Sequence, residues 1–342
     1  MKTYELRSDT FTKPVPAMRQ AMADALVGDD VYREDPTVNQ LEELAANLTG
    51  KEQALFVTSG SMGNLISLFI NGGRMAEVLA HAKSHIFHHE LASAATIAGV
   101  LPIGVDTPRG LLQAQALEPL IKPVVYDLAR TKMIEVENTI GGICYPLSTL
   151  KEIYALAKRR SLSVHMDGAR IFNASIATGV QVSEIARYAD TVTFCLSKGL
   201  GAPVGSMLCG SAEFIDKARS VRKMLGGGMR QSGILAAAGI YALHHHVQRL
   251  ADDHVHAKRL AQALLDTSWA RVCLDDVETN IVLFDVDGVE ASRACEVFKR
   301  YGVLCTTEGT QLRFVTHIDV SNTDIDEVCA IIASIDKKEF DS

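Results

Sequence analysis

Three short segments rich in serine, glycine and ionisable residues each follow a run of apolar residues. They contain the side chains best suited to chemistry, and they span residues 58–64, 165–170 and 197–205. In sheets of parallel strands, functional side chains gather on the loops at the carboxyl ends of the strands. We therefore expect the three segments to meet at one edge of a sheet.

The segment 58–64 reads Thr-Ser-Gly-Ser-Met-Gly-Asn and precedes an apolar stretch, 65–70, that is predicted to be helical. A small residue such as Gly60 lets backbone N–H groups approach a phosphate at the positive end of a helix, and Ser61 adds a hydroxyl. The simpler interpretation is a turn that only caps the helix. Both remain open on this segment alone.

Asp167, in the segment 165–170, is expected at the end of a buried strand. A carboxylate in that position needs a cationic partner, because an unpaired buried charge is costly. A positively charged ligand atom could be that partner. The structural alternative is a salt bridge to Arg170.

Lys198 lies between a serine and a glycine, directly after the apolar run 192–196. A partly buried lysine can act as a Schiff-base amine, whereas most loop lysines are only solvated. Together the three segments offer a phosphate cradle, an acid and an amine. Pyridoxal phosphate requires these groups from its protein.

The elements that must position these residues follow an alternating pattern between residues 37 and 240. Helix-like segments alternate there with β-rich runs, which predicts βαβ units around a mostly parallel sheet. The runs are 54–58, 77–80, 133–137, 161–165 and 190–194. A continuous helical pattern over 242–265 then precedes a smaller α+β pattern. We expect a large α/β domain, residues 1–245, and a small α+β domain, residues 246–342.

Composition limits the classes of partner. The 342 residues carry a net charge of −7, and 47% of them are hydrophobic. An acidic chain without blocks of like charge is unsuited to bind nucleic acid or a membrane surface. The apolar stretch 234–243 is too short to span a bilayer, and the N-terminus lacks the apolar core of a signal peptide. We expect a cytoplasmic protein.

The cysteines and histidines suggest no separate site. Seven scattered cysteines without a CxxC pair are expected to be buried apolar residues in a reducing compartment, and no local spacing supports a catalytic thiol. The histidines at 244–246, 254 and 256 are expected on a wet helix surface. A metal site is the alternative, but the triplet contains no pair four residues apart. No metal ligand set is predicted.

Longer strings resemble a known family nearly from end to end. The chain resembles the L-threonine aldolases, which are fold-type I (aspartate aminotransferase-like) pyridoxal-phosphate enzymes in the group that includes the β-eliminating lyases. The strings are Leu6-Arg7-Ser8-Asp9-Thr10, Val27-Gly28-Asp29-Asp30-Val31-Tyr32, Glu34-Asp35-Pro36-Thr37-Val38-Asn39, Gly50-Lys51-Glu52, Asp167-Gly168-Ala169-Arg170, Cys195-Leu196-Ser197-Lys198-Gly199-Leu200-Gly201, Gly226-Gly227-Gly228-Met229-Arg230-Gln231 and Leu312-Arg313-Phe314-Val315-Thr316-His317.

The resemblance implies roles for individual residues toward pyridoxal 5'-phosphate. Lys198 would form the Schiff base and Asp167 would pair with the pyridine nitrogen. His85 would stack on the ring; without the resemblance it would be taken for a satisfied core histidine. The other residues implied to hold the cofactor are Gly60, Ser61, Arg170 and Arg230, of which Arg230 tends in this family to reach a neighbouring subunit. A homo-oligomer, most simply a dimer of dimers, is therefore expected.

The resemblance also implies a substrate and a reaction. Ser8, Arg170 and Arg313 would hold an amino-acid carboxylate, a task suited to guanidinium groups. The implied reaction is retro-aldol cleavage of L-threonine, L-allo-threonine and related β-hydroxy-α-amino acids to glycine and an aldehyde. A β-eliminating lyase or an aminotransferase of the same fold is the first alternative. A non-catalytic binding protein with this fold is the second.

The chain departs from the family pattern at two places. Asp127 stands where the family often has histidine near the substrate hydroxyl, and Ile140-Gly141 stand where His-Asn is common. Asp127, through a water molecule, or His85 is the predicted base that removes the hydroxyl proton. The change at 127 is expected to alter the preference between threonine and allo-threonine.

Overall fold

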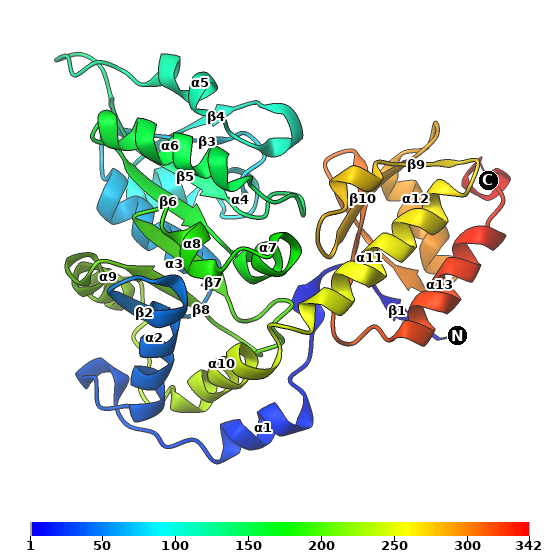
Figure 1. Cartoon of the computed structure of the whole chain (residues 1–342), viewed down its shortest axis with the longest axis horizontal. Helices are drawn as coiled ribbons and strands as arrows, with labels where there is room; N and C mark the ends of the chain where they lie inside the picture. The colour runs from blue at the N-terminus through cyan, green and yellow to red at the C-terminus, as the bar shows by residue number, and fades with distance from the viewer. Residues whose placement is uncertain (1, 342) are drawn as a thin grey trace.

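The computed structural model describes residues 2–341, which form two lobes built on separate sheets (Figure 1). The helices are α1 (Pro16–Ala23), α2 (Pro36–Thr49), α3 (Gly60–Ser67), α4 (His85–His88), α5 (Ala114–Leu117), α6 (Leu147–Arg159), α7 (Ile171–Thr178), α8 (Val182–Ala186), α9 (Ala212–Met224), α10 (Gly233–His245), α11 (Leu250–Leu265), α12 (Ala291–Arg300), α13 (Asn322–Ser334) and α14 (Lys338–Asp341). None of the helices within residues 2–341 combines the length and the apolar character needed to cross a bilayer.

The strands are β1 (Tyr4–Glu5), β2 (Gln53–Val57), β3 (Ala76–His81), β4 (Leu101–Val105), β5 (Arg130–Glu137), β6 (Ser163–Asp167), β7 (Thr191–Cys195), β8 (Ser206–Gly210), β9 (Ala270–Val272), β10 (Ile281–Val286), β11 (Val303–Leu304), β12 (Thr306–Glu308) and β13 (Gln311–Val315). The large lobe has a seven-stranded sheet in the order β2-β8-β7-β6-β5-β3-β4. In this sheet β8 runs against the direction of the other six strands. The prediction of a mostly parallel sheet is therefore confirmed.

Helices cover both faces of the large sheet. The apolar core on one face includes Leu41 of α2, Leu150 of α6 and Phe172 of α7. On the other face, Ile66 of α3 and Ile215 of α9 lie against the sheet. Because both faces are buried, the strands are almost continuously apolar rather than alternating.

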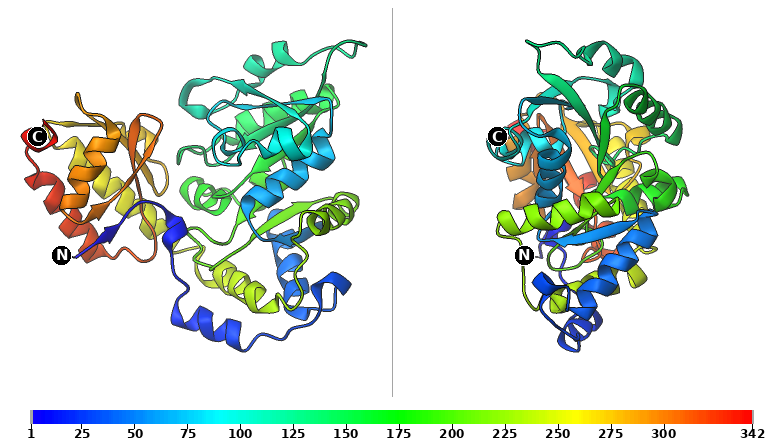
Figure 2. Two further views of the ribbon diagram at one scale, coloured as in Figure 1. Left: turned by 180° about the vertical axis from the view of Figure 1, so that it is seen from behind. Right: turned by 90° about the vertical axis from the view of Figure 1, so that its left-hand side faces the viewer.

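The small lobe consists of a four-stranded antiparallel sheet, β12-β13-β10-β9, with its helices on one face. Its aromatic core includes Phe284, Phe298 and Phe314, whose rings meet one another at centroid distances of 4.8–5.9 Å. The N-terminal strand β1 pairs in parallel with β11, so the start of the chain lies in this lobe (Figure 2). The expected division at residue 245 falls at the end of α10.

The helix expected over 242–265 is interrupted, since α10 ends at His245 and α11 starts at Leu250. The prediction of a wet histidine surface holds only for the exposed His244 and His245. It is wrong for three buried histidines, because each of their rings bonds to a different element. His246 Nδ1 lies 2.7 Å from the Leu200 carbonyl, His254 Nε2 lies 3.2 Å from Asn173, and His256 Nε2 lies 2.9 Å from Asn322.

The cysteine prediction is also partly wrong. Cys144, Cys195 and Cys209 are buried, as expected for small apolar residues. Cys273 is exposed, and Cys295, Cys305 and Cys329 are partly exposed, because they lie in the small lobe, where helices and strands are covered on one side only. All seven are free thiols.

Candidate active site

The three predicted segments meet at the carboxyl ends of neighbouring strands. Asp167 is the last residue of β6, and Lys198 follows β7, the next strand in the sheet. Gly60 starts α3, and a Cβ added at Gly60 would lie 2.9 Å from Cys195 Sγ at the end of β7. The first segment thus approaches the other two, although β2, which precedes it, is an edge strand.

The first turn of α3 is suited to hold an anion. Ser59 caps the helix by accepting a hydrogen bond from the Met62 N–H at 3.2 Å. The N–H groups of Gly60 and Ser61 lie in the first turn, where no intrahelical carbonyl can accept from them, and the helix dipole adds positive potential. The missing side chain at Gly60 lets this turn approach Cys195 closely, at the end of the strand that leads to Lys198.

Asp167 is buried, and its carboxylate accepts hydrogen bonds from Asn64 Nδ2 at 2.7 Å and from the Ala169 N–H at 3.0 Å. The predicted alternative, a salt bridge to Arg170, is wrong. Arg170 instead binds Asp9 at two points, 2.6 and 2.8 Å. No cationic side chain within residues 2–341 forms an ion pair with Asp167, so a protonated ring nitrogen fits as its partner.

Asp9 is fully buried and is the partner that the sequence analysis did not assign. Burial raises the pKa of Asp9, but the positive charges of Arg170 and Lys198 outweigh this effect and hold the pKa well below its usual range. Asn280 Nδ2 also donates to Asp9 Oδ2, at 3.2 Å. The carboxylate therefore joins the N-terminal segment to both lobes.

His85 starts α4, and both its ring and its backbone N–H bond to buried glutamates. Its Nδ1 lies 2.9 Å from Glu90 Oε1, and its backbone N–H donates to Glu137 Oε2 at 2.8 Å. Burial lowers the pKa of His85, but the hydrogen bond with Glu90 and the charge of Asp167 raise it above the usual value. Burial and the neighbouring charge of Asp167 also raise the pKa of Glu137 to about 8.

Lys198 lies among these groups with its amine available. Within residues 2–341, no side chain or carbonyl forms a hydrogen bond or ion pair with its Nζ. Its charge acts on Asp9, His85 and Glu137. The loop itself is fixed, because the Lys198 carbonyl accepts from Thr12 Oγ1 at 3.0 Å.

The expected carboxylate-binding residues converge on the N-terminal segment. Arg313 Nη2 donates to the carbonyl of Arg7 at 3.3 Å, and Ser8 is the next residue. Asp9, one position further, binds Arg170. Arg313 Nη1 also donates to Glu308 Oε2 at 3.0 Å, while its Nε is buried without a partner in the described chain.

Two expected residues do not join this group within one chain. Arg230 is exposed and pairs with Asp29 at 2.8 Å. Asp127 is also exposed, in the segment between α5 and β5 that projects from the large lobe (Figure 1). That segment holds few buried apolar side chains, which explains why it does not fold back onto the sheet.

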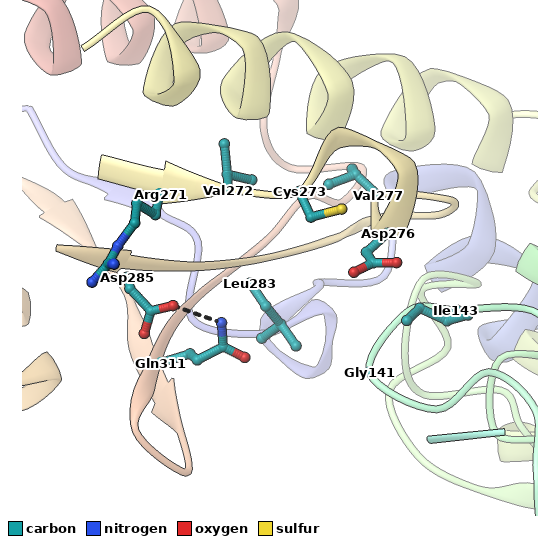
Figure 3. A pocket seen from close by; sticks show the side chains of 10 residues that line it. All are labelled: Gly141, Ile143, Arg271, Val272, Cys273, Asp276, Val277, Leu283, Asp285 and Gln311. Atoms are coloured by element: carbon teal, nitrogen blue, oxygen red, sulfur yellow. Dashed lines mark hydrogen bonds between the residues drawn. The ribbon is translucent and has the colours of Figure 1, made fainter. Parts of the chain in front are cut away.

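A groove lies between the lobes, beside the candidate site (Figure 3). It holds about 360 Å³ and contains none of Lys198, Asp167 or Gly60. Its floor is the face of the small sheet that bears Leu283, the register partner of Arg313. Its wall includes Gly141, where a Cβ would lie 3.5 Å from Leu283 Cδ1, so the divergent Ile140-Gly141 turn adjoins the small lobe.

The sequence analysis gave no role to Asp9, Asn64, Glu90 or Glu137. Asp9 and Asn64 stand inside strings that were recognised, but their partners are 161 and 103 residues away. Glu90 stands five residues after His85, just beyond the short helix α4, and this nearness in sequence is a usable local signal.

Comparisons with known proteins identify the family of the chain. A family model described as beta-eliminating lyase matches residues 5–287. The chain is 44% identical to the probable low-specificity L-threonine aldolase 2 of Arabidopsis thaliana, covering 98% of both chains. It is 44% identical to the low specificity L-threonine aldolase of Escherichia coli K12, covering 95% of this chain and 97% of the relative.

Solved structures share the fold. The threonine aldolase of Leishmania major superposes with a TM-score of 0.82 at 19% identity, over 95% of this chain and 97% of that one. A serine palmitoyltransferase of Sphingomonas wittichii gives a TM-score of 0.75 at 16% identity, over 97% and 86%. The expected fold type I is confirmed. The chain belongs to the beta-eliminating lyase family and, within it, to the low-specificity L-threonine aldolases.

Proposed function

We propose that the protein is a pyridoxal-phosphate-dependent aldolase that cleaves L-threonine, L-allo-threonine and related β-hydroxy-α-amino acids to glycine and an aldehyde. The observation that carries the proposal is the convergence of Lys198, Asp167 and the first turn of α3 on one site. Relatives at 44% identity over nearly the whole chain are named for this activity. A β-eliminating lyase or an aminotransferase would use the same site residues, but these relatives are named for neither of those activities.

The residues of this site fit pyridoxal 5'-phosphate. Gly60 and Ser61 would bind the phosphate, and Asp167 would hold the proton on the ring nitrogen. Lys198 would bind the aldehyde carbon through its free Nζ, and His85 would lie against the ring. When bound, the cofactor supplies an electron sink for the bond that breaks at Cα.

The substrate carboxylate would be bound by Ser8, Arg170 and Arg313. The buried and unpartnered Nε of Arg313 supports this assignment, because an N–H in that state favours an incoming acceptor. Glu308 accepts a hydrogen bond from Nη1 of Arg313. It would have to move away, or bind the guanidinium together with the substrate carboxylate. Asp9 keeps Arg170 in place and charged, so the substrate meets an oriented donor.

His85 would take the proton of the substrate β-hydroxyl. Its Nδ1 is bonded to Glu90, so Nε2 is the nitrogen that remains for the substrate. The carboxylate of Glu90 fixes the ring and stabilises the proton once it has moved, as an acidic partner does for a general base. Asp127 remains a proposed second acid–base group, one that could act only from a neighbouring chain.

We also infer a homo-oligomer, most simply a dimer of dimers, in the cytoplasm. Exposed apolar side chains occur on the segments next to Arg230 in the chain and on the segment that bonds to it, and they support a contact between chains. They are Leu26, Val27, Tyr32, Met224 and Ile234. Seven free thiols are consistent with a reducing compartment.

The test supplies the purified protein and pyridoxal phosphate with L-threonine or L-allo-threonine and follows acetaldehyde and glycine. Release of both products supports the aldolase, and the ratio of the rates with the two substrates measures the selectivity of the enzyme. Lys198→Ala should lose the visible absorption of the bound cofactor as well as aldehyde release, whereas Lys151→Ala, an exposed lysine on α6, should retain both. Ammonia and a keto acid as the products would instead establish the elimination or transamination alternative.

A further inference from the structure

The side chain of Asn64 connects three ionisable residues beneath the candidate cofactor site. It lies on α3, one turn after Gly60, and only 1% of its surface is exposed. Its Nδ2 donates to Asp167 Oδ2 at 2.7 Å and to Glu90 Oε1 at 3.0 Å. Its Oδ1 lies 3.0 Å from His165 Nε2.

Hydrogen-bond accounting fixes the direction of each contact. The two amide hydrogens of Asn64 go to two carboxylates, so Oδ1 must accept, and His165 Nε2 must carry a proton. His165 Nδ1 is then an acceptor for Thr191 Oγ1 at 2.9 Å. Burial lowers the pKa of His165 to about 4, so a neutral ring agrees with this pattern.

The two carboxylates bound by Asn64 have separate tasks in the proposed site. Asp167 would hold the ring nitrogen of the cofactor, and Glu90 Oε1 also bonds to His85 Nδ1. The Asn64 amide therefore links Asp167, which would control the protonation of the cofactor, to His85, which would accept the substrate proton, through Glu90. Within residues 2–341, no other side chain forms hydrogen bonds with both carboxylates.

The surrounding acids make these donors important. Carboxylate oxygens of Glu135, Glu137 and Asp167 all lie within 4.8 Å of one another. Burial and these neighbours raise the pKa of Glu135 well above its usual value. Within this cluster, Asp167 accepts hydrogen bonds from Asn64 and from the Ala169 N–H, and donors of this kind stabilise the negative charge of a carboxylate in general.

We propose that Asn64 is a positioning residue that holds Asp167 against the cofactor ring nitrogen and, through Glu90, holds His85 against the cofactor face. The inference rests on the cofactor assignment of the proposed function. It adds that two properties depend on the Asn64 side-chain amide. They are the protonation of the cofactor ring nitrogen and the orientation of His85 as the base. Asn64 does not itself touch the reacting atoms.

The test compares the holoenzyme of Asn64→Asp and Asn64→Ser with wild type. Two quantities are measured: the dissociation constant for pyridoxal phosphate, and the midpoint of the pH titration of the visible cofactor band. Both changes remove donors from Asp167 and make its carboxylate more basic, so the midpoint should rise. Cofactor affinity should fall roughly tenfold to hundredfold, as for loss of a hydrogen bond to a charged group.

Asn71→Asp is the matched control. Asn71 lies two turns further along the same helical segment, is half-buried, and donates to Ser67 Oγ at 3.3 Å rather than to a carboxylate. It should keep the wild-type affinity and midpoint. Asn64→Ser adds neither charge nor volume, so it keeps the test available if Asn64→Asp does not fold.

Three results would overturn the proposal. They are a dissociation constant within twofold of wild type in both Asn64 variants, weaker binding with an unchanged midpoint, and an equal effect of Asn71→Asp. The second result would assign Asn64 a purely structural role. None of these readouts uses aldehyde release, so a wild-type protein that binds the cofactor but does not cleave threonine would refute the proposed function and leave this inference tested.

Discussion

Asp9 and Arg170 form a buried, two-point ion pair beside Lys198, and we expect this pair to support both folding and substrate binding. A Cβ added at Gly199 would lie 3.8 Å from Asp9 Oδ2, so the carboxylate adjoins the lysine loop. Breaking a buried pair from one side leaves the other charge unpaired, which costs more than the pair contributes.

The first prediction concerns this pair. Asp9→Asn should lower the free energy of unfolding at pH 7 by about 3 kcal/mol, measured by urea denaturation, and should raise KM for the amino acid more than it changes kcat. The pKa of Asp9 is depressed in the folded state, so its stabilisation exists above the unfolded pKa and disappears as the pH falls through the folded value. The difference between wild type and variant should therefore shrink in acid. A difference that is constant with pH would contradict the argument.

The second prediction concerns His85, whose pKa Glu90 helps to raise. A base must be neutral to accept a proton, so the acidic limb of kcat/KM against pH should follow this group. Glu90→Gln removes the acidic partner, and the limb should move to lower pH. Glu43→Gln, an exposed glutamate on α2, should leave the limb unchanged. An unmoved limb in Glu90→Gln would exclude His85 as the group that titrates.

At the scale of residues, the sequence predicted the functional side chains but not the residues with which they form hydrogen bonds and ion pairs. Lys198 and Asp167 could be found because each follows a buried strand. The bond from Arg170 to Asp9 could not, because it joins positions 161 residues apart, and Arg170 has a nearer carboxylate at Asp167. Pairing of that kind depends on the path of the N-terminal segment, which no local pattern contains.

At the scale of elements, strands with uninterrupted apolar runs were predictable and two others were not. The strand β4 contains Pro102 and Gly104, which weaken its pattern, and it is tolerated because it lies at the edge of the sheet. The strand β8 returns antiparallel to β7 after the loop 196–205. That loop ends at Gly205, a position that requires glycine because its φ is 104° and a Cβ would lie 2.4 Å from Phe56 Cε2.

The third prediction concerns the contact between α3 and β7. A Cβ at Gly63 would lie 2.7 Å from Thr193 Cγ2, so α3 packs directly on the strand that leads to Lys198. Gly63→Ala should destabilise the fold by about 1–3 kcal/mol and weaken cofactor binding, because Gly60 and Asn64 move with the helix. Chemical denaturation and cofactor titration measure the two effects.

Thr193→Ala provides the control for this contact. Thr193 is fully buried, and its Oγ1 has no partner in the described chain, so its removal costs no hydrogen bond. The double variant Gly63→Ala/Thr193→Ala should recover most of both losses, with a coupling energy that exceeds the error of additivity. Purely additive losses would show that the Gly63 contact does not set the position of α3.

At the scale of the whole molecule, the N-terminal segment ties the lobes together across the site. Its strand β1 pairs with β11 of the small lobe, and Thr12 bonds to the Lys198 carbonyl in the large lobe (Figure 2). The sequence analysis assigned this segment to residues 1–245 as an arm of the large domain. Its pairing with a strand 299 residues later could not be read from local patterns, since both strands are only two residues long.

One surface of the molecule is unusually apolar for exposed side chains. Leu26 is 74% exposed, Tyr32 70% and Met224 60%. Leu26 and Tyr32 flank the pair Asp29-Asp30, which bonds to Arg230, and Met224 ends α9, just before the loop that carries Arg230. A Cβ at Gly233 would lie 2.7 Å from the Leu26 carbonyl, so this patch continues onto the start of α10. Contiguous apolar surface of this kind is characteristic of a contact between proteins.

The final prediction is that this patch joins two copies of the chain and that cofactor binding depends on the contact. In sedimentation experiments the wild-type protein should be a dimer or larger. Leu26→Asp/Met224→Asp should shift it to a smaller species, because two carboxylates would be buried without cations. Val255→Asp, at an equally apolar but isolated exposed position on α11, is the control and should not change the size.

If Arg230 serves a neighbouring site, the dissociated variant and Arg230→Ala should both bind pyridoxal phosphate more weakly, and their effects should not add. An active wild-type monomer, or full additivity of the two losses, would show that Arg230 acts only within its own chain, through Asp29.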